Sequence, residues 1–496
     1  MEIGVLVFLS SGLFLGWSLG ANDASHIFGT AVGSRMVRFS TAALLCSVFV
    51  ILGATLSGAG AAHSLGKLGA VSAIGGAFMV ALGAGLSVFF MTKLGLPVST
   101  TQAVVGAIIG WNLFAGSLVD FSTLANIAGS WVATPILSGI VTVIVYKGCL
   151  FLINRLTPHI LTLDALTRIG LILAGTFGAY SLGANNIANV MGVFVPSSPF
   201  AEFNVGDFTV TSTVQLFFLG AVAIAVGVYT YSYRVMMTVG DGIVPLSPVG
   251  ALACIVGESV TLLLFASEGL EYFLASHGLP TIPLVPVSSA QAVIGSVLGL
   301  GIYKGARDIR WTVLGRVVTA WISTPLISLS MTFVGLFFFQ NVFQQKAFEE
   351  YHYVVNEQVV AKAQALGYDL TTLNLDQLAG KTFNRATELQ AALRKQGAHL
   401  DNRREFDLVE LAKVTPVTIE GNRISAMDKG WLTQTQLSAM HRLDGKSYQY
   451  RWQLVDDLAN LSPEWQFKDR TVVNKVYNTD LDQKLRLVEN TFASNS

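Results

Sequence analysis

Charged residues are scarce in this chain of 496 residues, at 12% of the total, about half of their share in ordinary soluble domains. The scarcity is uneven, because the first 340 residues hold only 12 Lys/Arg and 11 Asp/Glu, and 39 of the 62 charged residues fall in the last 156. Such a split predicts a membrane-embedded part followed by a water-soluble tail. Basic and acidic residues are equal in number and no basic patch stands out, which argues against a nucleic-acid partner.

Cysteine is also rare. Cys46, Cys149 and Cys254 lie in apolar segments without CxxC spacing, which argues against a disulfide framework or a metal site. The chain has no HExxH motif, and its last 156 residues contain no nucleophile elbow or Walker loop. We therefore expect no enzyme activity and no bound cofactor.

The first 340 residues are dominated by apolar runs of roughly 17–25 residues, the length that crosses the hydrocarbon core as a helix. We place ten spans near residues 3–19, 40–60, 71–92, 97–113, 125–148, 168–184, 212–231, 247–267, 286–303 and 311–340. The sequence therefore predicts an all-α polytopic protein of an inner or plasma membrane, surrounded by the lipid bilayer.

Three landmarks occur twice in the same order. SLGAN stands at 18–22 and 181–185, and WVATP at 131–135 corresponds to WISTP at 321–325. PVSTTQAVVGAIIG at 97–110 matches PVSSAQAVIGSVLG at 286–299 in eight of fourteen positions. We infer two copies of one membrane unit, residues 1–160 and 161–340, followed by a C-terminal domain over 341–496.

The loop charges predict how the copies are related. Basic residues follow the first span of copy one and the PVS segment of copy two, as in GSRMVRF and YKGARDIR, whereas the equivalent loops of the other copy lack them. Because basic loops remain on the inner side, equivalent loops lie on opposite sides of the membrane. We expect inverted-topology repeats with the tail on the external face, an architecture typical of secondary transporters.

The stretch SLGANDASHIFGTAVG, residues 18–33, carries polar groups inside an apolar span. Its glycines predict an interrupted helix whose free backbone groups and side chains hold ions. Asp23 is costly at mid-membrane and therefore has a function there, unless it caps a helix near the interface. Asn22 and Asn185, placed identically in the two copies, either bind substrate or only hydrogen-bond between helices.

The PVS segments place hydroxyls and a glutamine in the first turn after a proline. Free N–H groups and hydroxyls at a helix start can cradle a tetrahedral oxyanion, although they can also serve as ordinary N-caps. The residues concerned are Ser99, Thr100, Thr101 and Gln102 in copy one, and Ser288, Ser289 and Gln291 in copy two. Glu258, a second acid in an apolar span, has either a coupling role or a structural one.

These motifs resemble the inorganic phosphate transporter (PiT) family, whose hallmark is a duplicated GANDVANA-like sequence in inverted halves, together with PVSTT segments. The resemblance covers about residues 1–340 and implies symport of inorganic phosphate with sodium or protons by a homodimer. It also implies that both GAND motifs and both PVS turns line one site. Each copy departs from the family pattern at one position. Copy one keeps Asp23 but has His26 in place of the motif's second Asn. Copy two keeps that Asn, as Asn189, but has Asn186 in place of the Asp.

We therefore predict substrate binding by Asn22, Asn185 and the PVS residues, with Asp23, His26, Asn186, Asn189 and Glu258 coupling the ion. Sodium would bind at Asp23, Asn22 and Asn186, whereas His26 could carry a proton. The motif does not separate phosphate from sulfate, since a related branch of the family resembles sulfate permeases. An anion channel is the closest rival of another class, but the inverted pair of copies argues against it.

The tail after residue 340 has the pattern of a small, mainly helical soluble domain. NEQVVAKAQAL, RATELQAALRKQ and LSAMHRLDG are periodic segments typical of short amphipathic helices. Trp431, Trp452 and Trp465 can supply a core. The sequence does not indicate the role of the tail; docking or stabilising an oligomer is the default interpretation, and a lid is the alternative.

Overall fold

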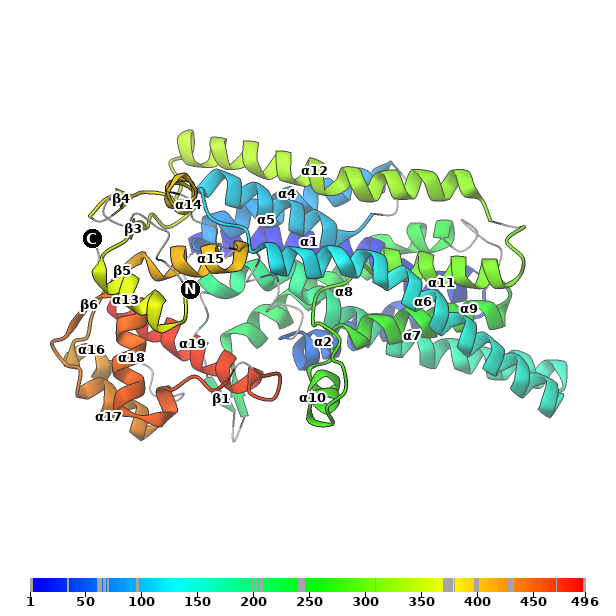
Figure 1. Ribbon diagram of the computed structural model, residues 1–496. Coiled ribbons are helices and arrows are strands. Elements are labelled where there is room, and N and C mark those ends of the chain that lie inside the picture. Colours follow the sequence, from blue (N-terminus) through cyan, green and yellow to red (C-terminus); the bar gives the residue numbers. More distant parts are fainter. Residues whose placement is uncertain are drawn as a thin grey trace.

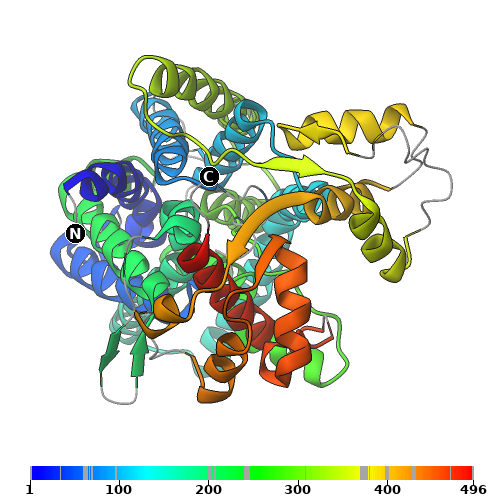
Figure 2. The same cartoon turned by 90° about the vertical axis from the view of Figure 1, so that its left-hand side faces the viewer.

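The computed structural model describes residues 3–33, 35–59, 65, 68, 71–94, 98–198, 200, 203–205, 208–239, 246–307, 309–368, 378, 380–396, 401–426, 432–469 and 471–493. Long helices run side by side through the first 341 residues, and the tail gathers at one end of this bundle (Figure 1). Seen from that end, the tail lies across the ends of the helices (Figure 2). The mark of the N-terminus lies at the same end.

The bundle consists of helices, with one 3-10 turn and one short hairpin. Its elements are α1 (Ile3–Gly33), α2 (Phe39–Ser57), α4 (Ile74–Lys93), α5 (Thr100–Ala115), α6 (Phe121–Leu156), α7 (Ile160–Met191), η1 (Gly192–Ser197), β1 (Phe203–Val205), β2 (Phe208–Val210), α8 (Ser212–Val239), α9 (Pro248–Leu264), α10 (Glu268–Ser276), α11 (Ser289–Tyr303) and α12 (Trp311–Asn341).

The described residues contain fewer full-length spans than the ten that we predicted. Six helices are long and apolar enough to cross a membrane, or seven if α9 and α10, which meet at a 68° bend, form one span. The PVS segments account for part of the difference, because α5 and α11 have only 16 and 15 residues. Ten consecutive residues without helix or strand, 279–288, lead into α11, so an apolar run of span length is here extended chain followed by a short helix.

The predicted interruption within residues 18–33 is wrong, because α1 is helical from Ile3 to Gly33 and α7 likewise passes through the second SLGAN. The glycines serve close packing instead. A Cβ atom on Gly20 would lie 2.0 Å from the carbonyl oxygen of Ile224, and one on Gly183 would lie 2.2 Å from that of Val50. Small residues thus let two backbones touch, as is usual between membrane helices.

The duplicated landmarks make reciprocal contacts. Helix α1 packs on α8 as α7 packs on α2, and α5 packs on α12 as α11 packs on α6. The glycines of the PVS helices illustrate this relation, because a Cβ atom on Gly106 would lie 2.2 Å from the carbonyl oxygen of Pro325, and one on Gly295 would lie 2.2 Å from that of Pro135. Each PVS helix therefore packs on the WxxTP helix of the other copy.

The tail combines short helices with a four-stranded antiparallel sheet of order β4-β3-β5-β6. Its elements are β3 (His352–Val354), α13 (Glu357–Ala365), β4 (Thr382–Phe383), α14 (Ala386–Lys395), α15 (Asn402–Leu411), β5 (Lys413–Thr418), α16 (Gly421–Ala426), α17 (Gln434–His441), β6 (Ser447–Tyr450), α18 (Arg451–Leu461), η3 (Pro463–Trp465) and α19 (Lys475–Phe492).

The three periodic segments of the tail all contain helices, namely α13, α14 and α17. The sheet was not expected from the sequence, because its strands have only two to six residues. Trp465 is fully buried in one apolar cluster, and Trp452 packs at the edge of a second one beside Tyr450. Trp431 lies outside the described residues.

Candidate functional site

Polar residues of both copies meet in the interior of the bundle around Asp23. Asn22 and Asp23 lie on α1, Asn186 lies on α7 and Ser289 begins α11. Oδ2 of Asp23 accepts hydrogen bonds from Ser289 Oγ at 2.7 Å and from Asn186 Nδ2 at 3.0 Å, and Oδ1 accepts one from Asn22 Nδ2 at 3.2 Å. Asp23 is 1% exposed, so a carboxylate of copy one is held inside the protein largely by donors of copy two.

Asn185, the counterpart of Asn22, binds a backbone segment. Its Nδ2 donates to the carbonyl oxygen of Val287 at 2.7 Å, and its Oδ1 accepts from the Val287 N–H at 2.9 Å. Nδ2 also donates to Oδ1 of Asn186 at 2.7 Å. Because the amide is used at both ends, Asn185 positions the chain just before Ser288 and Ser289.

Asn189 joins this network to the first PVS segment. Its Nδ2 donates to Thr101 Oγ1 at 2.9 Å and to Asn186 Oδ1 at 3.4 Å. Thr101 in turn donates to the carbonyl oxygen of Val287 at 3.2 Å. The starts of α5 and α11 therefore meet at one point beside α7.

Ser99 and Ser288 are N-caps, the alternative that the sequence left open. Ser99 Oγ accepts from the Gln102 N–H and Ser288 Oγ accepts from the Gln291 N–H, each at 3.2 Å. Both serines cap helices whose first residues, Thr100 and Ser289, belong to the predicted cradle. Capping fixes the direction in which the cradle residues leave the backbone.

Several buried oxygens of the site lack a hydrogen-bond partner in the described part of the chain. They are Thr100 Oγ1, Gln102 Oε1, Asn189 Oδ1 and Gln291 Oε1. Leaving a buried polar atom unpaired costs about 1–3 kcal/mol. Four such atoms around two helix starts indicate a place where a polar ligand supplies the missing partners.

His26 and Glu258 are buried close to this network but outside its hydrogen bonds. His26 lies on α1, three residues beyond Asp23, and neither ring nitrogen has a partner among the described residues. Glu258 lies on α9, which packs on α7 and α11; both of its carboxylate oxygens are unpaired there.

The arrangement can bind an anion and a cation side by side. Hydroxyls and helix N–H groups favour an oxyanion, whereas carboxylate and amide oxygens favour a small hard cation. Among the described residues no three His, Cys, Asp or Glu side chains are placed to hold a transition-metal ion.

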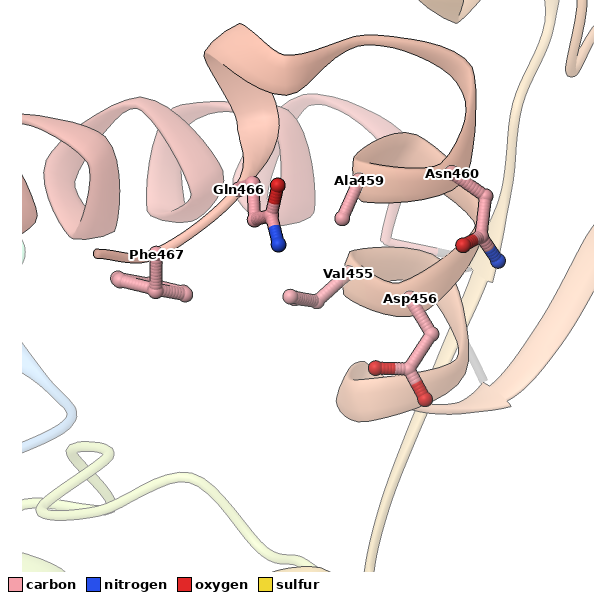
Figure 3. Close-up of a pocket in the computed structure, with 6 residues that line it drawn as sticks. All are labelled: Val455, Asp456, Ala459, Asn460, Gln466 and Phe467. Carbon is pink, nitrogen blue, oxygen red and sulfur yellow. The ribbon is translucent and has the colours of Figure 1, made fainter. Parts of the chain in front are cut away.

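Two surface hollows lie away from this network. One of about 490 Å³ is formed in the tail by α18 and the chain after η3, where Gln466 and Phe467 face Val455 (Figure 3). A second, of about 350 Å³, lies between the starts of α6 and α15. Neither is lined by a residue that the repeated motifs single out.

Comparison with known proteins agrees with the motifs. The family model described as the phosphate transporter family matches residues 19–332 and, in a second match, 273–415. The chain belongs to this family. The second match extends into the tail, beyond the limit near residue 340 that the motifs suggested.

Relatives within the phosphate transporter family carry the names of two anions. A Haemophilus influenzae protein that bears the name of a phosphate permease is 26% identical over 399 residues, which covers 63% of this chain and 91% of the relative. The sulfate permease CysP of Bacillus subtilis is 29% identical over 345 residues, covering 67% and 87%. A solved structure entitled "The sodium-dependent phosphate transporter" shares the fold, with a TM-score of 0.53 and 22% identity over 68% of this chain and 98% of that one.

The family assignment and the apolar helices together establish an integral membrane protein. The motifs singled out most of the buried polar network, but Val287 was missed. Its peptide group joins Asn185 to Thr101 through main-chain atoms, which no side-chain pattern reveals. The only signal was its place directly before the two serines of the second PVS segment.

Proposed function

We propose that this protein is a secondary active transporter, a symporter that moves inorganic phosphate across the membrane together with sodium ions or protons. The observation that supports this most is the buried carboxylate of Asp23, bonded to Ser289 and Asn186 of the other copy. A site built between two copies can change its exposure when the copies move against each other, which is how alternating access works in repeat-built carriers.

The inverted relation of the copies belongs to this proposal. The reciprocal pairs α1 with α8 and α7 with α2, and α5 with α12 and α11 with α6, are what a twofold relation between the copies would produce. Together with the loop charges, they support membrane units 1–160 and 161–340 in opposite orientations, with domain 341–496 on the external face.

In the proposed mechanism the phosphate lies between the starts of α5 and α11. Thr100, whose hydroxyl has no partner among the described residues, donates a hydrogen bond to one of its oxygens. On binding, Thr101 and Ser289 turn their hydroxyls to the anion, away from the Val287 carbonyl and the Asp23 carboxylate. Gln102 and Gln291 offer their unpaired Oε1 atoms to the proton that phosphate carries near neutral pH. Among the described residues, no lysine or arginine is hydrogen-bonded to this network.

The coupling ion would sit on the Asp23 side of the same site. Sodium would bind oxygens of Asp23, Asn22 and Asn186, which are hard ligands. With protons as the coupling ion, Asp23, Glu258 and His26 are the buried titratable groups that could carry them. In either case the cation offsets the charge of the anion, so that the pair crosses with less net charge.

Sulfate is the second candidate substrate, because CysP shares 29% of its residues with this chain over 345 positions. Sulfate is also a tetrahedral dianion, but it has no proton for Gln102 and Gln291. An anion channel remains the rival from another class, and a homodimer the expected assembly.

Counterflow in proteoliposomes tests the proposal. Vesicles loaded with unlabelled phosphate should accumulate labelled phosphate transiently above its external concentration, because a carrier exchanges one anion for another. Equal entry without accumulation would indicate a channel. Counterflow of sulfate in place of phosphate would favour the second candidate.

A further inference from the structure

The tail touches the bundle at α5, which carries the first PVS segment, and at α10, which precedes the second PVS segment along the chain. Its first contact is the chain directly after α12. Ala347 is 1% exposed, and its carbonyl oxygen accepts from Trp111 Nε1 on α5 at 3.0 Å. The Glu349 N–H donates to Ser72 Oγ, just before α4, at 2.9 Å. The approach is close, because a Cβ atom on Gly76 would lie 2.2 Å from the Ala347 oxygen.

The second contact lies at the C-terminal end of α5, five residues beyond Trp111. Gly116 ends this helix in a left-handed conformation, with φ of 67°. Its carbonyl oxygen accepts from the N–H of Thr387 in α14 at 3.2 Å, and the side chain of Arg385 covers it. Since α5 begins with Thr100 and Thr101, one rigid helix of 16 residues, about 24 Å long, connects the tail to the first cradle.

The third contact reaches the second copy. Lys475, the first residue of α19, donates to Glu271 of α10 at 2.7 Å. The side chains of these residues are 29% and 10% exposed, so the ion pair is partly removed from water. Helix α10 leads, through residues 277–288, directly to Ser288 and Ser289 of the second cradle.

We propose that the tail is a regulatory clamp on the transport cycle. It holds α5 of copy one at Trp111 and Gly116, holds α10 of copy two, which precedes the second cradle along the chain, at Glu271, and restrains the separation of the two copies on the tail side of the membrane. The Lys475–Glu271 ion pair is the contact that releases, because it is the one made by two side chains without backbone hydrogen bonds. The proposal rests on the transport function proposed above.

Charge removal tests the clamp. In Lys475→Gln and in Glu271→Gln we expect phosphate counterflow to be about two- to fivefold faster than in the wild type, the effect of roughly 0.4–1 kcal/mol for such a pair. The exchange of charges in Lys475→Glu with Glu271→Lys should restore the wild-type rate. Lys484→Gln, which removes an ion pair to Asp480 within α19, is the matched control and should leave the rate unchanged.

A covalent clamp gives the opposite test. In a protein with Cys46, Cys149 and Cys254 replaced by Ala, cysteines at positions 271 and 475 are joined by a short bis-maleimide. We expect counterflow to fall at least tenfold after joining, while the protein treated with a monofunctional maleimide keeps its rate. Wild-type counterflow in the joined protein would overturn the clamp, as would unchanged rates in both charge-removal variants.

A readout that needs no substrate separates this proposal from the transport function. If the wild type shows no counterflow of phosphate or sulfate, the transport proposal fails, and the clamp is tested by hydrogen exchange. Amides of residues 279–288 should then exchange faster in Lys475→Gln than in the wild type and in Lys484→Gln. Equal exchange in all three proteins would refute the clamp.

Discussion

Replacing Asp23 by Asn is the sharpest test of the site, because it keeps the size of the side chain and removes its charge. In the wild type the carboxylate accepts from three donors, Asn22, Asn186 and Ser289. An amide at this position has one acceptor atom and presents an N–H₂ group to the remaining donors. We expect the variant to lose cation-coupled uptake.

The magnitude follows from the hydrogen bonds that are lost. A hydrogen bond to a charged group contributes about 1.5–3 kcal/mol. The amide of the variant has only one acceptor atom, so at least one of the three hydrogen bonds is lost, and two donor groups then face each other. A single such loss should destabilise the folded protein by about 1.5–3 kcal/mol, and removal of the carboxylate charge should take away the anionic ligand of the cation. Asn186→Asp, which adds a carboxylate at the equivalent position of copy two, should act less severely and increase the dependence on sodium.

The assay is gradient-driven uptake of labelled phosphate by reconstituted protein. Circular dichroism and size exclusion in detergent must first show that Asp23→Asn is folded. Uptake with an unchanged dependence on the cation gradient would refute the coupling role, and Asp23 would then serve only to hold α1, α7 and α11 together.

Four further predictions address selectivity, coupling, packing and topology. Arsenate should inhibit phosphate uptake, and inhibition by sulfate should be at least about fivefold weaker than inhibition by arsenate. Sulfate leaves Gln102 and Gln291 without a donor, at a cost of roughly 1–3 kcal/mol. Equal inhibition by the two anions in competition assays would reassign the substrate to sulfate. With protons as the coupling ion, His26→Asn should flatten the pH dependence of uptake and leave counterflow intact, whereas an unaltered pH profile would remove His26 from the coupling path. Gly295→Ala should destabilise the protein by about 1–3 kcal/mol through overpacking, because the added Cβ would lie 2.2 Å from the carbonyl oxygen of Pro135. The control is Gly148→Ala, whose added Cβ has nothing within 4 Å and which should melt like the wild type in thermal unfolding. Cysteines at His159 and Lys395 should react with an impermeant thiol reagent on opposite sides of the membrane, and labelling of both from one side would exclude an external tail.

The sequence predicted the membrane character, which the family assignment supports, and it singled out most residues of the buried polar network around Asp23. A polar pattern that occurs twice inside apolar segments is readily recognised, because polar groups within the membrane are energetically costly and therefore rare. The pairing of Asp23 with Ser289 and Asn186 could not be read from it, since it depends on how α1 crosses α7 and α11. That the motifs share one site was implied by the resemblance to the phosphate transporter family.

The errors have physical causes. Glycines in SLGAN suggested a break, but their small size is used for backbone contact at Ile224 and Val50, and composition does not distinguish the two uses. The PVS segments have the length of spans, yet α11 is only 15 residues long, because the Asn185 side chain takes the place of helical hydrogen bonds at the Val287 peptide, just before the helix begins. The sheet of the tail was missed because its two- to six-residue strands carry too little periodicity.

Coupled transport of phosphate is the function that we propose for this member of the phosphate transporter family. The most direct measurement is uptake of labelled phosphate by proteoliposomes in which a sodium gradient and a pH gradient are imposed separately. Coupled transport predicts that labelled phosphate accumulates against its own gradient under one of the two cation gradients. This accumulation should be lost when an ionophore collapses that cation gradient. Entry that only follows the phosphate gradient, unaffected by either cation gradient, would contradict it.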